Sequence, residues 1–250
     1  KYLHPMKRSL LLLTLPLLLP LCSSAAPVVI TNAGLTYTQN FNGLAVNAGQ
    51  SSVTQSRGSS SQVVQDFHAV SRSVGGTVNF GGAASTTSGY KFGNGASGIV
   101  GGFVTYNSTD FMRFVSATNL NDTADSAAAY TSDVWSGTNN TTVTVDGSQS
   151  GATTNSLRFG AASARTITLA GNNVISSGGL LVSSAVGLFN NTITGGVLQG
   201  SAGGDLIVHQ WNASGTLTIA SEIANNTSAT ALTKSGSGTL VLSGANTFSG

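Results

Sequence analysis

Short apolar triplets return at a nearly fixed interval through residues 157–250, and they alternate with polar, glycine-rich segments. One series starts at Leu157, Leu180, Leu206 and Leu232. A second starts at Ile167, Ile193, Leu217 and Leu240, and a shorter third includes Val174, Val197 and Ile223. Three short strands therefore recur in the same order about every 24 residues, a period typical of repeat architectures.

Several of these strands read apolar, polar, apolar, as in Ile167-Thr168-Leu169 and Leu217-Thr218-Ile219. Such alternation places the aliphatic side chains on one side of the strand and threonine on the other. Gly171-Asn172-Asn173 and Gly195-Gly196 separate the strands and tolerate the backbone angles of tight corners. The pattern predicts an all-β, right-handed, single-stranded parallel β-helix, a three-faced solenoid with about 24 residues per coil and an irregular β-rich N-terminal cap.

An antiparallel β-sandwich is the alternative fold for a chain of short strands. Turns in such a sandwich recur at a much shorter interval than the one observed here, which would not keep three series of strands in phase. The spacing therefore favours the solenoid.

The amino terminus has the order of a secretory signal peptide. Lys7 and Arg8 precede an apolar run over residues 10–21, and small residues follow at 23–26. We expect Met6 as the initiator and cleavage after Ala25, which makes residues 1–25 the signal peptide. Cys22 could suggest a lipoprotein, but the preceding Leu19-Pro20-Leu21 departs from the small residues of a lipobox.

Charge argues against a nucleic-acid partner. Only 7% of the residues are charged, against about a quarter in an average soluble domain. Without the basic residues of the signal peptide, seven Lys and Arg stand against eight Asp and Glu. No basic stripe is left to meet phosphates, so we expect no nucleic-acid binding.

The rest of the chain divides by composition. Residues 26–62 form a Ser-, Asn- and Gly-rich leader, and residues 63–156 are rich in aromatic residues and glycine and are expected to form a cap or irregular first coils. Residues 157–250 form the regular β-helix. Asn119 to Tyr130 is expected to be a loop or one short helix, and Thr141 to Val145 a strand.

Residues 232–250, with the sequence LTKSGSGTLVLSGANTFSG, resemble one copy of the autotransporter-associated β-strand repeat, also called the passenger-associated transport repeat. Segments such as Ser177-Gly-Gly-Leu-Leu-Val and Gly204-Asp-Leu-Ile-Val-His resemble the coils that precede this repeat. Gly98-Ile-Val-Gly-Gly-Phe-Val-Thr-Tyr-Asn and Asn155-Ser-Leu-Arg-Phe resemble such proteins more weakly, so the resemblance extends from about Gly75 to the end. In that family the repeat lies in the secreted passenger region of very large exported bacterial proteins and is thought to help the β-helix fold.

The resemblance implies a non-catalytic, exported passenger or stalk at the bacterial cell surface or outer membrane, serving passenger folding, display and adhesion. The implied partners are the outer-membrane translocation machinery or the protein's own C-terminal barrel, together with a surface glycan or a host or matrix ligand. The chain is then interpreted as an N-terminal fragment of a larger protein. A secreted polysaccharide-binding or polysaccharide-degrading protein, similar to pectin lyases, is the alternative function.

Two motifs invite a catalytic interpretation. Residues 93–98 match G-x-G-x-x-G, but the following Ile99 to Phe103 would make a poor helix, so we expect a turn and no nucleotide. Asp66, His68 and Ser71 lie close together in sequence, but no nucleophile elbow accompanies the serine, and triad members normally come from separate elements.

The regular coils hold few groups for chemistry. His209 has no second ligand at zinc spacing, and Trp211 beside it could cover a coil edge or contact a sugar. Asp205 and Glu222 are the only acids of residues 157–250 and fall near different corners of one coil, whereas glycoside hydrolysis needs two carboxylates at a defined separation. Gly203-Gly204-Asp205 resembles a single calcium-binding nonapeptide without tandem copies. We therefore assign no catalytic, cofactor-binding or metal-binding residue.

Overall fold

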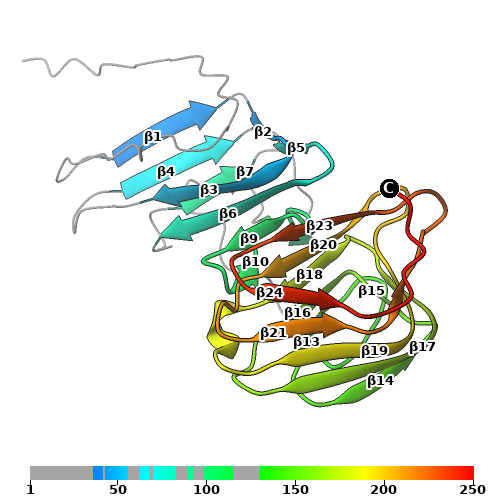
Figure 1. Ribbon diagram of the computed structural model, residues 1–250. Helices are drawn as coiled ribbons and strands as arrows, with labels where there is room; N and C mark the ends of the chain where they lie inside the picture. The colour runs from blue at the N-terminus through cyan, green and yellow to red at the C-terminus, as the bar shows by residue number, and fades with distance from the viewer. Residues whose placement is uncertain are drawn as a thin grey trace, which may run out of the picture.

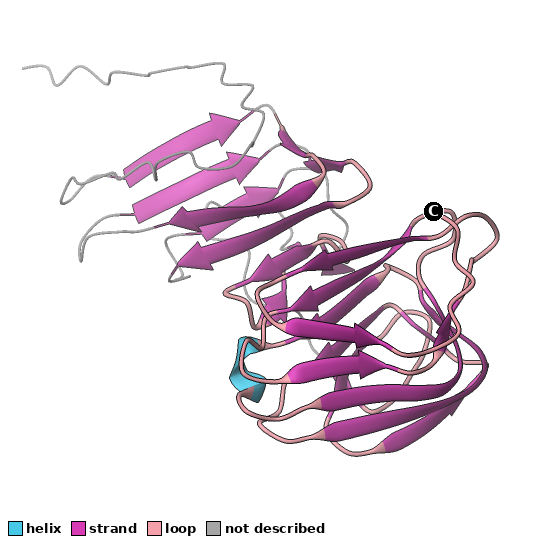
Figure 2. Cartoon of the chain, in the orientation of Figure 1, coloured by secondary structure: helices cyan, strands magenta, loops and turns pink. Residues whose placement is uncertain are grey.

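The computed structural model describes residues 36–41, 43–55, 62–67, 70–82, 89–92, 98–114 and 130–250. The expected signal peptide, most of the G-x-G-x-x-G segment and residues 119–129 lie outside these ranges. The regular secondary structure of the described residues is almost entirely strand, and the strands form two stacks of coils joined by turns and loops (Figures 1 and 2). We call residues 36–114 the N-terminal stack and residues 130–250 the C-terminal stack.

One face of the C-terminal stack is a six-stranded parallel sheet in the order β12-β13-β16-β18-β20-β23. We call it the junction sheet, because one of its faces meets the N-terminal stack. Its strands are β12 (Thr131–Ser132), β13 (Asn140–Val143), β16 (Ser156–Phe159), β18 (Gly179–Val182), β20 (Asp205–Gln210) and β23 (Ala231–Ser235).

The other two faces share a second parallel sheet, because its longest strands bend across a corner. In β17 the pairing register with β19 shifts between Leu169 and Asn172. The halves before and after this bend pair with different short strands, which gives three faces per coil. The strands are β14 (Gly147–Ser150), β15 (Thr153–Thr154), β17 (Arg165–Ile175), β19 (Asn191–Gln199), β21 (Thr216–Ile219), β22 (Glu222–Ile223) and β24 (Thr239–Leu242).

Glycine is required at the corner of β19. Gly195 has φ of 72°, a left-handed conformation that residues with a Cβ rarely adopt. A Cβ at this position would lie 2.6 Å from the carbonyl oxygen of Leu169 in the preceding coil. The corner therefore needs both a positive φ and a close approach to the preceding coil, and only glycine allows both.

The predicted all-β parallel solenoid is confirmed, with Leu, Ile and Val side chains stacked inside the C-terminal stack. Leu157 pairs with Leu180, and Leu217 pairs with Leu240, as the intervals predict. Leu180, however, pairs with Val208 rather than with Leu206, and Ile193 pairs with Ile219 rather than with Leu217. A slip of two residues keeps every side chain on the same face of a strand. The alternation of apolar and polar residues therefore does not determine which of these two pairing registers forms.

The two ends of the C-terminal stack differ. At the first coil, Trp135 packs against the aliphatic core. At the last coil, the outer edges of β23 and β24 have no partner strand among the described residues. Lys234 of β23 is in register with buried Val208 yet remains exposed, and its Nζ donates to Gly236 O at 2.8 Å.

Residues 36–106 also form coils, a periodicity that the aliphatic triplets of the sequence did not indicate. Thr36 pairs with Gln62, Leu44 with Val70 and Gly49 with Gly76, so three faces repeat at a nearly constant interval, close to that of the C-terminal stack. The strands are β1 (Thr36–Phe41), β2 (Leu44–Val46), β3 (Gly49–Gln55), β4 (Gln62–Phe67), β5 (Val70–Arg72), β6 (Gly76–Gly82), β7 (Gly89–Phe92), β8 (Gly98–Ile99), β9 (Val104–Tyr106), β10 (Asp110–Phe111) and β11 (Arg113–Phe114).

The core of the N-terminal stack is aromatic, whereas that of the C-terminal stack is aliphatic. Phe80 is fully buried and lies edge-on to Tyr90 and Phe92, with ring centroids 4.6 and 5.5 Å apart. Phe67 stacks on Phe92 at 5.8 Å. Edge-to-face and offset stacked pairs are the favourable arrangements of aromatic rings.

The two stacks lie side by side, and the outer face of the junction sheet is buried between them (Figure 1). All residues of β18 and β20 are buried. The one helix of the described residues, the 3-10 helix η1 (Ser184–Val186), follows β18. Within these ranges, therefore, no helix has the length and apolar character needed to span a bilayer.

We predict that Leu217→Ala destabilises the C-terminal stack by about 2–5 kcal/mol, because it leaves a cavity among side chains that are fully buried. Thr218→Ala is the matched control, since Thr218 is the next residue of β21 and is only partly buried; its effect should stay below about 0.5 kcal/mol. Urea unfolding followed by circular dichroism measures both. Equal losses would contradict the assignment of Leu217 to the core.

Candidate functional site

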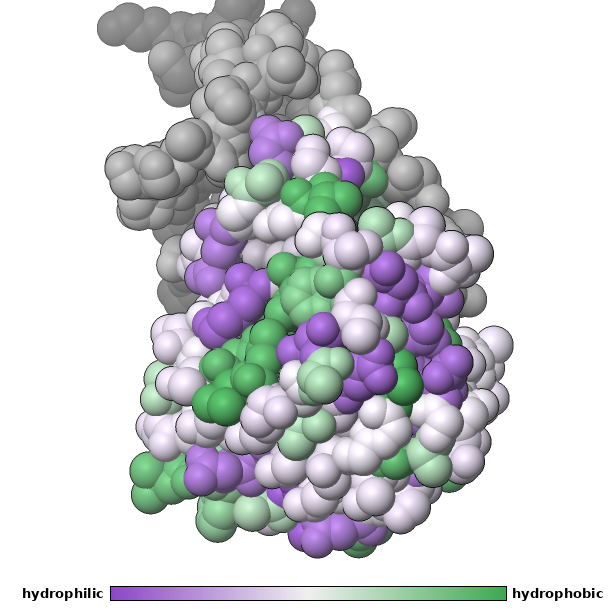
Figure 3. All heavy atoms as spheres, turned by 45° about the vertical axis from the view of Figure 1, so that its right-hand side comes forward, coloured by the Kyte–Doolittle hydropathy of each residue, from purple (hydrophilic) through white to green (hydrophobic). Residues whose placement is uncertain are grey.

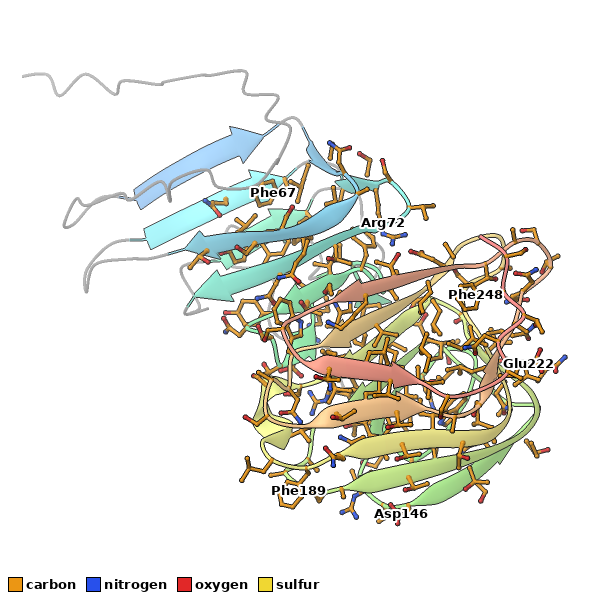
Figure 4. The ribbon with its side chains drawn as sticks, viewed as in Figure 1. Phe67, Arg72, Asp146, Phe189, Glu222 and Phe248 are labelled. Carbon is orange, nitrogen blue, oxygen red and sulfur yellow. The ribbon has the colours of Figure 1, made fainter. Side chains whose placement is uncertain are left out.

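A cluster of polar and charged side chains lies between the two stacks, on the outer face of the junction sheet. Arg72, at the end of β5 (labelled in Figure 4), reaches across to Asp205, at the start of β20. Its two terminal nitrogens donate to the two carboxylate oxygens of Asp205 at 2.8 and 2.6 Å. Such a bidentate pair fixes the orientation of both side chains as well as their distance. We call this cluster the junction site.

Both members of the ion pair have further partners. Arg72 Nε donates to Gly76 O at 2.7 Å, and its guanidinium lies over the Phe103 ring, 5.4 Å from the centroid. Asp205 also accepts a hydrogen bond from the Thr233 hydroxyl of β23. Burial alone would raise the pKa of Asp205, but the hydrogen bonds from Arg72 and Thr233 and the charge of Arg72 together lower it below its usual value.

His209 joins the same face of the sheet to the N-terminal stack. Its Nε2 lies 2.8 Å from Gly102 O, and its Nδ1 lies 2.9 Å from Ser235 Oγ. A carbonyl oxygen can only accept, so Nε2 carries the proton and Ser235 donates to Nδ1. Burial lowers the pKa of His209 to about 4, mainly by desolvation of the charged form. The imidazole is therefore neutral at physiological pH.

A second ion pair closes the junction beside β16. Arg158 contacts Asp110 of β10, and its guanidinium lies 4.1 Å from the centroid of the Tyr130 ring. The Tyr130 hydroxyl in turn accepts a hydrogen bond from the Phe111 backbone N–H. Burial raises the pKa of Tyr130 to about 12 despite the nearby positive charge of Arg158.

This geometry supports a structural role rather than catalysis. Ser235 and His209 have the contact of a nucleophile and its base, but Ser235 is only 3% exposed and His209 is fully buried. The orienting group of the imidazole is the Gly102 carbonyl rather than a carboxylate. A substrate has no access to the hydroxyl while the two stacks are in contact.

The expected candidates for chemistry do not converge in the described residues. Asp205 lies in the junction sheet, whereas Glu222 lies in β22 of the other sheet and accepts from Thr247 Oγ1 at 2.6 Å. Ser71 is exposed in β5, and His68 lies outside the described ranges. Trp211 follows β20, and its indole N–H has no protein acceptor.

The described residues also offer no evident metal or ligand cavity. They contain no group of three His, Cys, Asp or Glu side chains with metal-binding geometry. Both carboxylate oxygens of Asp205 already accept hydrogen bonds from Arg72, and the positive charge of that guanidinium disfavours a calcium ion at Gly203-Gly204-Asp205. A cavity of about 20 Å³ beside Trp135 has room for little more than a water molecule.

Asparagine side chains at the coil corners have a structural role. Asn212 is 1% exposed and donates to Phe189 O of the preceding coil at 3.0 Å. Asn140 is also buried and accepts from Asn155 and Ser156, each at 2.9 Å. The asparagines of the N-x-S/T sequences at Asn140 and Asn212 are thus used in coil-to-coil hydrogen bonds.

Sequence reasoning did not identify the junction site, although the chain carries one signal for it. Leu180-Leu181-Val182 and Leu206-Ile207-Val208 are uninterrupted apolar runs, unlike the alternating strands of the second sheet. A strand that is apolar on both sides is typical of a sheet buried on both faces. Leu181 and Ile207 are 0% and 2% exposed and point away from the coil interior.

We predict that Asp205→Ala destabilises the protein by about 3 kcal/mol, because it leaves the Arg72 guanidinium buried without a counter-ion. The double variant Arg72→Met/Asp205→Leu removes both charges and should regain most of that loss. Guanidinium unfolding curves of the three proteins give the comparison. A double variant as unstable as Asp205→Ala would show that the loss comes from packing rather than from the unpaired charge.

Comparison with known proteins agrees with the resemblance noted in the sequence. The model of the passenger-associated-transport-repeat family matches residues 232–250. The chain is 32% identical over 225 residues to the adhesin BmaC autotransporter of Brucella suis biovar 1 (strain 1330). This alignment covers 85% of the chain and 6% of the relative. No solved structure matches the chain.

The residues matched by the family model form the last coil of the C-terminal stack, from β23 through β24 to the chain's final residues. The last coil of the chain therefore carries one copy of the passenger-associated transport repeat.

Proposed function

We propose that the chain is a non-catalytic, exported segment of a bacterial autotransporter-type passenger that builds and displays a β-helical stalk at the cell surface. The observation that carries this proposal is the transport repeat at residues 232–250, which forms the last coil of a parallel β-solenoid. Adhesion is the expected role of the whole protein, because the similar Brucella protein is an adhesin. The chain spans only 6% of that relative.

The repeat is built to fit on the coil before it. Gly238 N donates to Gln210 O at 2.8 Å, and a Cβ on Gly238 would lie 2.2 Å from Asn212 O. A Cβ on Gly244 would lie 2.1 Å from Ser221 O. The glycines of the repeat thus allow the backbone of one coil to approach the backbone of the preceding coil closely.

A stack of this kind suits a chain that emerges through a membrane in sequence order. Each new coil completes its backbone hydrogen bonds on the exposed edge of the last one, so the folded part serves as the template. Growth outside the membrane would then oppose backward movement of the chain. The outer-membrane translocation machinery, or a barrel in the same protein, is the partner that this mechanism requires.

The composition agrees with this destination. Cys22 is the one cysteine of the sequence and lies within the expected signal peptide, so the exported chain has no need of disulfide formation. The surface shown in Figure 3 mixes small hydrophobic and hydrophilic areas. The loop before β19 exposes Leu188 by 82% and Phe189 by 43%, which makes it a candidate contact for a glycan or a matrix protein.

We predict that Gly238→Val prevents the last coil from stacking, because its side chain would collide with the backbone carbonyl of Asn212. In the complete protein displayed by a Gram-negative host, this variant should reduce the protease-resistant passenger at the cell surface several-fold. Ser237→Val is the matched control, since Ser237 is exposed and adjacent. Surface protease digestion, followed by a cell-adhesion assay, measures both.

Unchanged surface passenger in Gly238→Val would contradict the role of the repeat in folding and display. Cleavage of a polysaccharide by the purified wild-type chain would contradict the non-catalytic assignment.

A further inference from the structure

The contact between the two stacks has a different construction from the contacts between coils. Among the described strands, β1 to β11 pair only with one another, and β12 to β24 pair only with one another. No backbone ladder therefore joins the N-terminal stack to the C-terminal stack in the described residues. The contact consists of side chains and isolated hydrogen bonds, such as Ser184 N to Ser108 O at 3.0 Å and Gly236 N to Gln50 Oε1 at 2.7 Å.

We propose that the N-terminal stack is an acid-releasable cover on the outer face of the junction sheet. It docks at neutral pH through Arg72–Asp205 and His209–Gly102, and it separates in acid while the coils of the C-terminal stack remain paired. This goes beyond the proposed role in display, because it assigns a conformational change to the junction itself.

The surroundings of His209 provide the pH sensitivity. From the N-terminal stack, the Gly102 carbonyl, the Phe111 ring and the positive charge of Arg72 face the imidazole. From the C-terminal stack, Asp205 and the Ser235 hydroxyl lie beside it. The Phe111 and imidazole ring centroids are 6.0 Å apart. A proton on Nδ1 would take away the acceptor of the Ser235 hydrogen bond and place a charge next to Arg72.

Separation of the two stacks would remove the buried surroundings of His209. In the separated state, His209 would face water and titrate near its ordinary pKa of 6.5, whereas the docked imidazole titrates at about 4. The docked state therefore binds fewer protons, so docking weakens as the pH falls from 6.5 toward 4. The difference in pKa corresponds to a decrease of up to about 300-fold in the docking constant. The lowered pKa of Asp205 acts in the same direction at still lower pH.

The two stacks have separate cores, which is why release need not unfold either one. One cluster consists of buried apolar side chains from within residues 143–223, and the other consists of buried apolar side chains from within residues 44–112. Separation would uncover Leu181 and Ile207, which form an apolar strip between the charged groups Arg158 and Asp205 on the same face. Acid would thus expose a surface that is closed at neutral pH.

Two pairs of introduced cysteines test the proposal. They are placed in the chain without its signal peptide, because residues 26–250 contain no cysteine of their own. Asn47→Cys with Ser237→Cys places spin labels on exposed positions across the junction, close to the Gln50–Gly236 contact. Ser148→Cys with Thr168→Cys places them on exposed, directly paired positions within the C-terminal stack. Dipolar broadening of the electron paramagnetic resonance spectrum reports whether each pair stays close between pH 7.5 and 3.5.

We expect the junction pair to lose its broadening between pH 6.5 and 4, while the pair within the stack keeps it. In a His209→Gln background, the side-chain amide can still donate to Gly102 O but does not titrate, so separation should shift to lower pH. Loss of both signals together, no loss at the junction, or an unchanged pH profile in His209→Gln would each overturn the proposal. Unchanged display of Gly238→Val, which would contradict the proposed function, would leave this result unaffected, so the two hypotheses can fail separately.

Discussion

The parallel backbone ladder between successive coils is the interaction on which the rest of the structure depends. Most of the strands are short and bury little surface alone, and their N–H and C=O groups need partners. Each coil finds those partners in the coil before it and presents a new edge to the coil after it. Aliphatic columns, asparagine corners and glycine bends all serve to keep consecutive coils in register. Stability is therefore distributed along the stack and depends on contacts between neighbours.

The backbone ladder explains how each stack forms but not why the two stacks lie side by side. That arrangement depends on side-chain contacts between them. A sheet whose inner face lies against an aliphatic core has its outer face available, and in β18 and β20 that face is apolar as well. The N-terminal stack covers it. A buried ion pair adds little net stability compared with a hydrophobic pair of similar size. Its two-point geometry, however, fixes where β5 meets β20, because Arg72 must meet both oxygens of Asp205.

Much of the C-terminal stack could be predicted from the sequence because its strands repeat the same residue types at one period. The N-terminal coils repeat at a similar interval, but aromatic residues such as Phe80 and Tyr90 replace the aliphatic triplets. Composition therefore suggested irregular structure. The two-residue slips at Leu180 and Ile193 were also invisible, because they leave the inward face unchanged. The junction site joins residues 133 positions apart, and no local pattern encodes that distance.

The sparse charge of this protein follows from the same ladder. A solenoid that grows by adding coils benefits from uncharged faces, because like charges in consecutive coils would be stacked at the strand spacing of about 4.8 Å. The second sheet follows this rule with threonine at paired outward positions, such as Thr168 and Thr194. Charges are used where a single contact must be specific, as in Arg72–Asp205 and Arg158–Asp110. In this chain, repetition builds the two stacks, and a few ionisable side chains fix the contact between them.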